Sequence, residues 1–357
     1  MAGLGTLVKK EVKDLCLDRE SSLANGSNQV DKTKEKIKAY LGIDVGSIST
    51  NLAVIEAIED DEYNILKTVY LRTDGNPIEA IKKGVAELSE LEKKVQIRGV
   101  GTTGSGRKLA KFVAGADIVK TEITAHASAS KYFVPDIKTI LEIGGQDSKI
   151  IILRKYDGKN VVVDYAMNSI CAAGCGAFLD HQANRLKIPI EEFGCLALQY
   201  KLPVNIAGRC TVFAESDMIH KQQIGHKKED IIYGLCRAIV RNYISNVAKG
   251  KEIRPPIMFQ GGVAANKGVK KALEEELRTE VIVPEYYNVM GAIGAAILAK
   301  KNTNGETKFR GFRLVNLDII TNSYECEKCD NHCELTEFKI ERKLAARWGS
   351  RCGNYNL

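Results

Sequence analysis

The chain has 357 residues, which exceeds the roughly 250–300 residues at which one hydrophobic core usually stays undivided, so two lobes are expected. Its composition, 44% hydrophobic and 27% charged, is typical of a globular protein and excludes a disordered or fibrous one. The net charge of +7 comes from lysines and arginines interspersed with acids, with no long basic block, and no nucleic-acid partner is predicted.

No segment reaches the roughly 18–20 unbroken apolar residues that a membrane span needs, and the N-terminus lacks the apolar core of a signal peptide. We therefore expect a cytoplasmic protein with no membrane partner. Ten cysteines in such a chain favour metal or redox chemistry over a disulfide framework, because the cytosol keeps thiols reduced.

The first half of the chain predicts a sheet that is followed by a helix. Residues 1–36 are charged and rich in Ser, Asn and Lys, which predicts an N-terminal extension without a chemical role. Apolar runs separated by turn-forming residues then predict a three-stranded meander, at 39–46, 51–58 and 64–73. Pro77 opens an amphipathic helix over 77–94, and a strand at 95–101 runs into a glycine-rich turn.

The same pattern recurs later in the chain. A second meander is predicted at 139–145, 149–156 and 159–167, with Asp157-Gly158 as a hairpin turn. Further helices are predicted at 230–250, 267–277 and 288–301. Two meanders, each followed by helices, predict a duplicated domain with a cleft between its halves. Four parts result: an extension at 1–36, lobe I at 37–135, lobe II at 136–307 and a cysteine-rich C-terminal extension at 308–357.

Three glycine-rich turns each follow a hydrophobic strand, at 44–50, 142–147 and 260–266. Glycine lets backbone amides approach phosphate oxygens closely, and hydroxyls in the first turn add donors. A carboxylate at a strand end, Asp44 or Asp147, suits a hydrated Mg²⁺ ion, which prefers a few hard oxygen ligands.

In this order and spacing, the three turns resemble the phosphate-1, phosphate-2 and adenosine motifs of the actin/Hsp70/sugar-kinase (ASKHA) superfamily, over residues 39–300. No GxxxxGK[ST] segment is present, which excludes a P-loop enzyme. The resemblance implies an α/β fold of duplicated ribonuclease-H-like domains with ATP or ADP and Mg²⁺ in an interlobe cleft. The second motif opens with Glu142 rather than the Asp usual in kinases, so Gln146 and Asp147 join Asp44 as the candidate catalytic residues. The candidate nucleotide-binding residues are Gly46, Ser47, Ser49, Thr50, Gly144, Gly145, Gln146, Gly261, Gly262 and Asn266.

Two cysteines precede amphipathic segments. Cys171 begins CAAGCGAFLDHQANRL, and Cys210 begins CTVFAESDMIHK, in which Thr211 is expected to cap a helix. Each cysteine is expected at a helix N-terminus, where the helix dipole and free amides stabilise a thiolate.

The CAAGxG and CTVFAES segments resemble the activators of 2-hydroxyacyl-CoA dehydratases, in the BadF/BadG/BcrA/BcrD ATPase family. ATPase subunits of benzoyl-CoA reductases and reductases of double-cubane cluster proteins belong to the same group. The resemblance implies a homodimer in which Cys171 and Cys210 of each subunit hold one shared 4Fe-4S cluster. It also implies an ATP-dependent activator that takes electrons from ferredoxin or flavodoxin and delivers them to an iron-sulfur metalloenzyme. Since clusters generally need four protein ligands, two per chain requires a two-fold axis.

The sequence departs from the commoner family pattern at Cys175, where Thr is more usual, and Cys195 is nearby. A rival arrangement therefore uses Cys171, Cys175, Cys195 and Cys210 within one chain. A helix beginning at Cys171 would place Cys175 one turn away on its own face, which disfavours this rival.

Four further cysteines lie near the C-terminus. Cys326, Cys329, Cys333 and Cys352 have metal-ligand spacing, with His332 as a substitute ligand. A structural zinc ion or a second iron-sulfur cluster fits this spacing, and four unrelated reduced thiols are the alternative.

Two other functions remain open from the residues. A small-molecule kinase of the same superfamily would use Asp147 as catalytic base, but it leaves Cys171 and Cys210 unexplained. A nucleotide-dependent assembly or chaperone module would need no redox partner. The sequence does not name the electron acceptor, which could be a 2-hydroxyacyl-CoA dehydratase, a benzoyl-CoA-type reductase or a double-cubane protein.

Overall fold

The computed structural model describes residues 36–59, 62–168 and 174–356. The expected N-terminal extension therefore lies outside the described residues, apart from Lys36, and so does Cys171. The described chain divides into two compact units. Unit 1 contains Phe133–Met290, and unit 2 contains Lys36–Tyr132 together with Gly291–Leu357.

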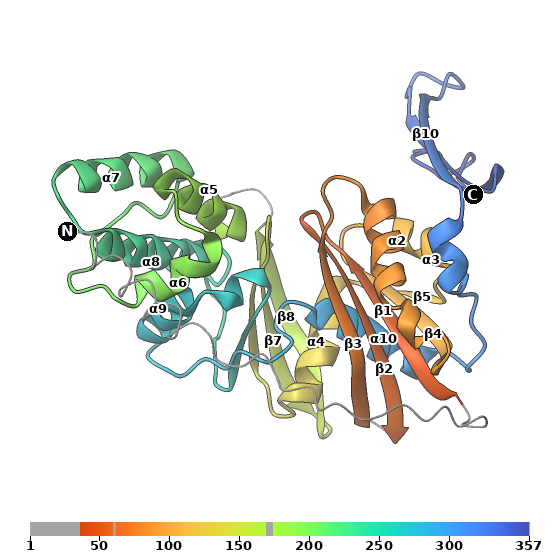
Figure 1. Cartoon of the computed structure of the whole chain (residues 1–357), viewed down its shortest axis with the longest axis horizontal. Coiled ribbons are helices and arrows are strands. Elements are labelled where there is room, and N and C mark those ends of the chain that lie inside the picture. The colour runs from red at the N-terminus through yellow and green to blue at the C-terminus, as the bar shows by residue number, and fades with distance from the viewer. Residues whose placement is uncertain (1–35, 60–61, 169–173, 357) are drawn as a thin grey trace, which may run out of the picture. The chain divides into compact units, whose positions relative to one another are not determined.

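Unit 2 is built on a five-stranded sheet with the order β3-β2-β1-β4-β5 (Figure 1). Its strands are β1 (Ile37–Val45), β2 (Ser49–Glu59), β3 (Glu62–Arg72), β4 (Val95–Thr103) and β5 (Ile118–Val119). β1 pairs antiparallel with β2 and parallel with β4. The first predicted meander is thus confirmed.

The helices of unit 2 cover both faces of this sheet. They are α2 (Pro77–Glu87), η1 (Ser89–Leu91), α3 (Arg107–Ala114), α4 (Glu122–Phe133) and α10 (Met290–Asn302). Pro77 begins α2 as expected, and the Asn76 side chain caps it by accepting from the amide of Glu79 at 3.2 Å. The helix predicted over 77–94 is shorter in the structure, because α2 ends at Glu87 and η1 follows.

The two faces of β1 are used differently because successive strand residues point to opposite sides. Leu41 and Ile43 share a buried core with Ile81 and Val85 of α2. Gly42 faces α10, so closely that a Cβ added there would lie 1.8 Å from the carbonyl oxygen of Ala292. The small residues of this segment therefore let the α10 backbone approach the sheet.

Unit 1 repeats this arrangement with a four-stranded sheet of order β8-β7-β6-β9. Its strands are β6 (Thr139–Ile143), β7 (Ser148–Tyr156), β8 (Lys159–Asn168) and β9 (Ile257–Gln260). β6 pairs antiparallel with β7 and parallel with β9, as β1 does with β2 and β4. Asp157 and Gly158 both have positive φ, as a tight hairpin turn requires. The second meander and the predicted duplication are confirmed.

The helices of unit 1 gather beside its sheet (Figure 1). They are α5 (Gly176–Leu186), α6 (Ile190–Ala197), α7 (Thr211–Gln223), α8 (Lys228–Asn246), η3 (Gly262–Ala265) and α9 (Lys267–Leu277). α8 is buried along most of its length and contributes Tyr233 and Tyr243 to the core of the unit.

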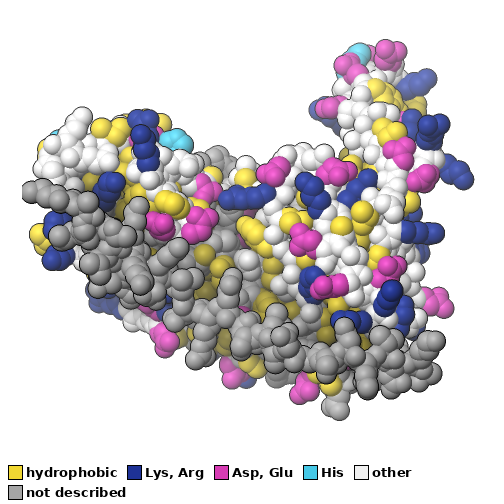
Figure 2. Space-filling view, viewed as in Figure 1, with side chains coloured by type: hydrophobic (Ala, Val, Ile, Leu, Met, Phe, Trp, Pro, Cys, Tyr) yellow, Lys and Arg dark blue, Asp and Glu magenta, His cyan; other side chains and the backbone are white. Residues whose placement is uncertain are grey.

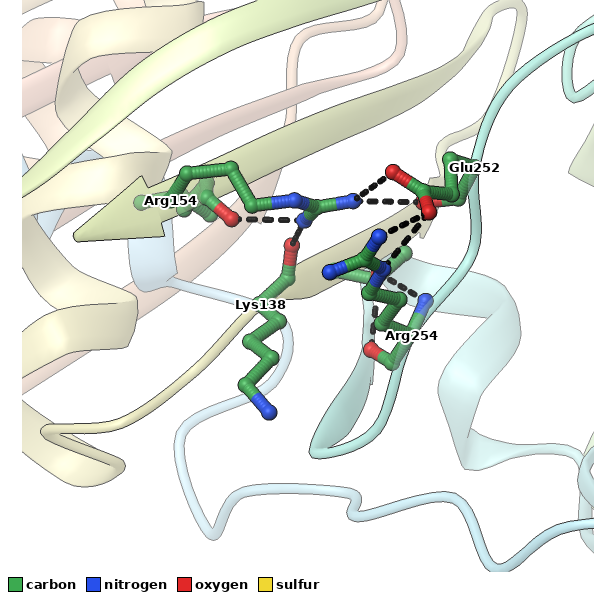
Figure 3. Close-up of polar contacts among 6 residues, drawn as sticks. Lys138, Arg154, Glu252 and Arg254 are labelled. Atoms are coloured by element: carbon green, nitrogen blue, oxygen red, sulfur yellow. Dashed lines mark hydrogen bonds and ion pairs between the residues drawn. The ribbon is translucent and has the colours of Figure 1, made fainter.

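The segment before β9 is held against β7 by charged side chains (Figure 3). Arg154 donates to the carbonyl of Lys138 at 3.2 Å and to the carboxylate of Glu252 at 3.1 Å. Arg254 also donates to Glu252, at 2.7 Å. Glu252 and Arg254 are both more than half exposed, so these contacts guide the path of the chain more than they stabilise it.

The C-terminal residues form a second sheet in unit 2, which the sequence patterns did not predict. After η4 (Phe312–Asn316), its antiparallel strands are β10 (Ile319–Glu325), β11 (Glu334–Ile340) and β12 (Lys343–Trp348). The Trp348 ring stacks on Phe112 of α3 with centroids 5.8 Å apart, and Phe338 is fully buried in the same core. Contacts with α3 thus join this sheet to unit 2.

On the face shown in Figure 2, Lys and Arg side chains are mixed with Asp and Glu, which agrees with the interspersed charges of the sequence. Within the described residues, no helix is both long enough and apolar enough to cross a membrane.

Candidate functional site

The first predicted phosphate turn is the hairpin between β1 and β2. The amide of Gly46 donates to the carbonyl of Ser49 at 2.8 Å, and the Ser47 side chain is exposed. The buried Thr50 hydroxyl lies 3.0 Å from the hydroxyl of Thr73, which donates to the carbonyl of Gly46 at 3.1 Å. Thr50 therefore braces the turn from inside, while Ser47 lies where a ligand can reach it.

Asp44 lies at the end of β1 among glycines. A Cβ added to Gly104 would lie 2.4 Å from its Oδ1, and one added to Gly291 would lie 2.0 Å from its Oδ2. Gly291 is in the first turn of α10, where the helix dipole favours an anion. Sequence reasoning did not name Gly104 or Gly291 as site residues, although their signal was present in the glycine-rich turn 101–106 and at the start of α10.

The second predicted phosphate turn joins β6 to β7. Its first residue, Glu142, lies directly across the hairpin from Lys149. Lys149 Nζ is 2.8 Å from Glu142 Oε2 and 3.0 Å from Asp147 Oδ2. The side chains of Lys149 and Glu142 are 3% and 6% exposed, whereas Asp147 is 33% exposed and Gln146 is exposed. A buried lysine thus holds Asp147 in place and leaves its carboxylate accessible.

The predicted adenosine turn lies against the second phosphate turn. Gly261 has φ +89°, and a Cβ there would lie 2.5 Å from the carbonyl oxygen of Ile143 and 2.7 Å from Glu142 Oε1. Only glycine combines that backbone conformation with so close an approach. Gly262 is exposed, as a ligand contact requires.

Asn266 closes the same turn and serves as the N-cap of α9. Its Oδ1 accepts from the amide of Val269 at 3.0 Å, and its buried Nδ2 has no hydrogen-bond partner among the described residues. Unit 1 therefore brings the second phosphate turn and the adenosine turn together. The first phosphate turn belongs to unit 2, and its meeting with the other two in a cleft stays a prediction.

The second phosphate turn is bonded directly to the start of α5. The amide of Gly176 donates to the carbonyl of Gly144 at 2.8 Å, and the amide of Ala177 donates to the carbonyl of Gly145 at 2.8 Å. Cys175 is the N-cap of α5 and is buried. The single-chain arrangement of four cysteines was disfavoured above because a helix beginning at Cys171 would carry Cys175 on its own face. That reason is wrong, because α5 begins at Gly176 and not at Cys171.

Cys210 is the N-cap of α7, as expected for a cysteine at a helix N-terminus. Thr211 was expected to cap this helix, and that expectation is wrong, because the extended backbone at Cys210 makes Thr211 the first helical residue. Within the described chain, no side-chain hydrogen bond caps α7. Val212 and Phe213, next to Cys210, are 68% and 66% exposed, which sequence reasoning did not identify.

Two further cysteines lie in unit 1: Cys195, which only the rival arrangement uses, and Cys236, for which the sequence predicts no role. Cys195 lies in α6. Burial raises the pKa of Cys236 in α8, so this thiol stays protonated.

Cys326, Cys329 and Cys333 lie in the turn between β10 and β11, and Cys352 follows β12. Cys326 and Cys333 are buried beside each other, and the amide of Arg351 donates to Cys333 Sγ at 3.5 Å. A hydrogen bond with Ser350 lowers the pKa of Cys352. His332 lies 2.5 Å from Glu325.

Among all described residues, no three or more His, Cys, Asp or Glu side chains are grouped closely enough to hold a metal ion. The four-cysteine site stays a prediction.

The model of the BadF/BadG/BcrA/BcrD ATPase family matches residues 41–299. The chain belongs to this ATPase family. It is 32% identical over 261 residues to a 2-hydroxyisocaproyl-CoA dehydratase activator of Clostridioides difficile, covering 72% of this chain and 94% of the relative. The expected family resemblance is confirmed.

Two solved structures agree with the fold. Component A of the (R)-2-hydroxyglutaryl-CoA dehydratase of Acidaminococcus fermentans matches with a TM-score of 0.66 at 32% identity, covering 74% of this chain and 98% of that one. The 2-hydroxyisocaproyl-CoA dehydratase activator of Clostridium difficile, solved with bound ADPNP, matches with a TM-score of 0.65 at 30% identity, covering 74% and 94%. The ASKHA fold class is confirmed, and β10–β12 lie beyond the residues that the family model matches.

Proposed function

We propose that this ATPase is an activator that uses ATP to deliver low-potential electrons to a partner metalloenzyme of the 2-hydroxyacyl-CoA dehydratase type. The observation that carries the proposal is the pair of backbone hydrogen bonds from the start of α5 to Gly144 and Gly145. They join the predicted phosphate turn to the start of α5, whose N-cap Cys175 follows Cys171 by four residues, so a movement of the turn would be passed to this segment through two hydrogen bonds. A nucleotide can shift the equilibrium between two arrangements of the protein only if it binds the two arrangements with different affinities.

The residues of both phosphate turns fit the proposed ATP and Mg²⁺. The amides around Gly46 and Gly144 and the exposed Ser47 hydroxyl would bind phosphate oxygens. Asp44 and the accessible carboxylate of Asp147 would hold Mg²⁺ through its waters. The exposed Gln146 would orient the water that attacks the terminal phosphate.

The position of Cys210 suits a ligand of an iron-sulfur cluster. The thiol lies at an uncapped helix start, where free amides of α7 stabilise a thiolate and the sulfurs of an anionic cluster. In the proposed homodimer, Cys171 and Cys210 of both subunits hold one 4Fe-4S cluster, which when bound would carry single electrons from ferredoxin or flavodoxin. The exposed Val212 and Phe213 beside Cys210 support a protein interface at this point, because such apolar side chains gain by being covered.

An iron count tests the shared site. The chain is purified anaerobically with Cys326, Cys329, Cys333 and Cys352 replaced by Ser, and iron and sulfide are measured per dimer. About four iron atoms per dimer support the shared cluster, and about eight support one cluster within each chain.

Two single substitutions in this background sharpen the iron count. Cys210→Ser should remove the absorption near 400 nm, since the cluster would lose half of its ligands. Cys195→Ser should keep it, because Cys195 is a ligand only in the rival single-chain arrangement. A colourless wild-type protein that phosphorylates a metabolite would refute the proposal in favour of a kinase. A slow ATPase that no cluster loss affects would favour an assembly module.

The acceptor can be assigned by direct assay. Reduced ferredoxin or flavodoxin, ATP and the loaded activator are mixed with a 2-hydroxyacyl-CoA dehydratase, a benzoyl-CoA-type reductase or a double-cubane protein, and reduction of each acceptor is followed. We expect ATP-dependent reduction of the dehydratase, since the Clostridioides difficile dehydratase activator and component A of the Acidaminococcus fermentans dehydratase are each 32% identical to this chain over the matched residues.

We also propose that the four C-terminal cysteines bind one metal ion or a second cluster. The support is the position of Arg351, whose amide donates to Cys333 Sγ and so brings the segment before Cys352 beside the turn that carries the other three cysteines. Zinc and iron counts on the wild type and on a chain truncated before Tyr324 test this. Equal metal contents in both would refute it.

A further inference from the structure

Asn242 of α8 lies between the segments that enter α5 and α7. Its side chain is almost completely buried, with 1% of the residue exposed. A buried amide is costly unless both its donor and its acceptor are satisfied, so the contacts of this side chain require a reason.

The donor end of Asn242 holds the segment that enters α7. Its Nδ2 donates to the carbonyl of Gly208 at 2.5 Å, two residues before Cys210. The neighbouring Arg241 donates to the carbonyl of Ile206 at 2.6 Å. Gly208 fits this position because an added Cβ would lie 2.6 Å from the carbonyl oxygen of Ala238. The chain before Cys210 is therefore held directly on the surface of α8.

The acceptor end of Asn242 faces the segment that enters α5. A Cβ added to Gly174 would lie 2.7 Å from Asn242 Oδ1, so only glycine leaves room for the amide. Gly174 immediately precedes Cys175, the N-cap of α5. Asn246 donates to the same Oδ1 at 3.2 Å and fixes the orientation of the amide.

We propose that Asn242 is a positioning residue that sets the distance between the cysteine-bearing starts of α5 and α7. The Asn242 amide donates a hydrogen bond to the segment before α7 and contacts the segment before α5. An apolar side chain of similar size cannot do both. The proposed consequence, which rests on the cluster function proposed above, is that Asn242 keeps Cys210 at the spacing a bound cluster requires. Groups that orient metal ligands from behind typically change metal affinity about 10–100-fold when they are removed.

The test uses Asn242→Ala and Asn242→Leu in the full-length chain. Val240→Ala is the matched control, because Val240 is equally buried in α8 and its side chain makes no hydrogen bond. The first measurement is hydrogen exchange of residues 204–210 in the iron-free protein. The second is the rate at which a chelator removes iron after anaerobic loading.

We expect the amides of residues 204–210 to exchange hydrogen about tenfold or more faster in both Asn242 variants than in Val240→Ala. The chelator should also remove iron from both variants about tenfold or more faster than from Val240→Ala. Exchange in 204–210 no faster than in Val240→Ala would overturn the positioning role. Faster exchange with unchanged iron loss would overturn its link to the cluster. If the wild type binds no iron, the proposed function fails, and the exchange measurement alone still decides whether Asn242 holds the segment that enters α7.

Discussion

Lys149 is predicted to be the most sensitive charged residue of unit 1. Its ammonium lies 2.8 Å from the buried Glu142 and 3.0 Å from Asp147. At 2.8 Å, one pair of unit charges attracts by about 6 kcal/mol with an effective dielectric constant of about 20, before desolvation offsets part of it. Lys149→Met keeps the aliphatic stem and removes the charge, so the buried Glu142 would lose its cation.

We expect Lys149→Met to lower the free energy of unfolding by about 3–5 kcal/mol at neutral pH, the usual cost of leaving one buried charge unpaired. Glu142→Gln in the same chain should recover most of this loss, with a coupling energy of about 2–3 kcal/mol, because the two residues interact directly. Urea unfolding followed by far-UV circular dichroism measures both values. Hydrogen exchange in β6 and β7 should rise in Lys149→Met and fall again in the double variant.

Lys251→Met provides the control. Lys251 lies 2.7 Å from Asp164, but that carboxylate is nearly half exposed and screened by water, so the unfolding midpoint should change little. The reasoning is refuted if Lys149→Met behaves like Lys251→Met, or if the effects of Lys149→Met and Glu142→Gln simply add.

Three further substitutions test other parts of the fold. Gly42→Ala would place a Cβ 1.8 Å from the Ala292 carbonyl and should cost about 1–3 kcal/mol or more; an unchanged melting temperature would contradict the close approach of α10. Tyr243→Phe removes a 2.7 Å hydrogen bond to the Lys149 carbonyl and should cost about 0.5–1.5 kcal/mol. Burial raises the pKa of Tyr243, so as the pH rises the tyrosine ionises first in the unfolded chain, and its contribution to the stability of the fold is lost above about pH 10. The difference in urea midpoint between wild type and Tyr243→Phe should therefore shrink from pH 8 to pH 10.5. A constant difference would contradict this reasoning. Trp348→Ala should cost about 2–3 kcal/mol and raise hydrogen exchange in β10–β12, whereas unchanged exchange would show that the stack on α3 does not hold this sheet.

Much of the fold could be predicted from the sequence because its signals are local. Alternating apolar residues and short polar turns identified both meanders, and Asp157-Gly158 identified a turn that needs positive φ. The C-terminal strands escaped prediction because β10 is largely exposed and carries little alternation. Their stability comes instead from Phe338 and Trp348 packing on Phe112, a residue far away in the chain.

The candidate site divides in the same way. Glycine-rich turns after strands predicted the phosphate and adenosine turns, because a tight turn depends on its own few residues. The partners of individual side chains were not predictable. Asn266, expected to bind nucleotide, caps α9, and Thr50 bonds to Thr73 inside the hairpin. Such roles depend on which segment packs alongside.

By itself the sequence determined the strand periods, the turns, the family and the cysteines that make it a candidate redox ATPase. Only the tertiary structure decided that Lys149 joins Glu142 to Asp147, that α5 is bonded to the Gly144 turn, and that Asn242 lies between two cysteine-bearing segments. The physical reason is that backbone preferences act over a few neighbouring residues. Buried hydrogen bonds and ion pairs, by contrast, are set by close packing between segments far apart in the chain.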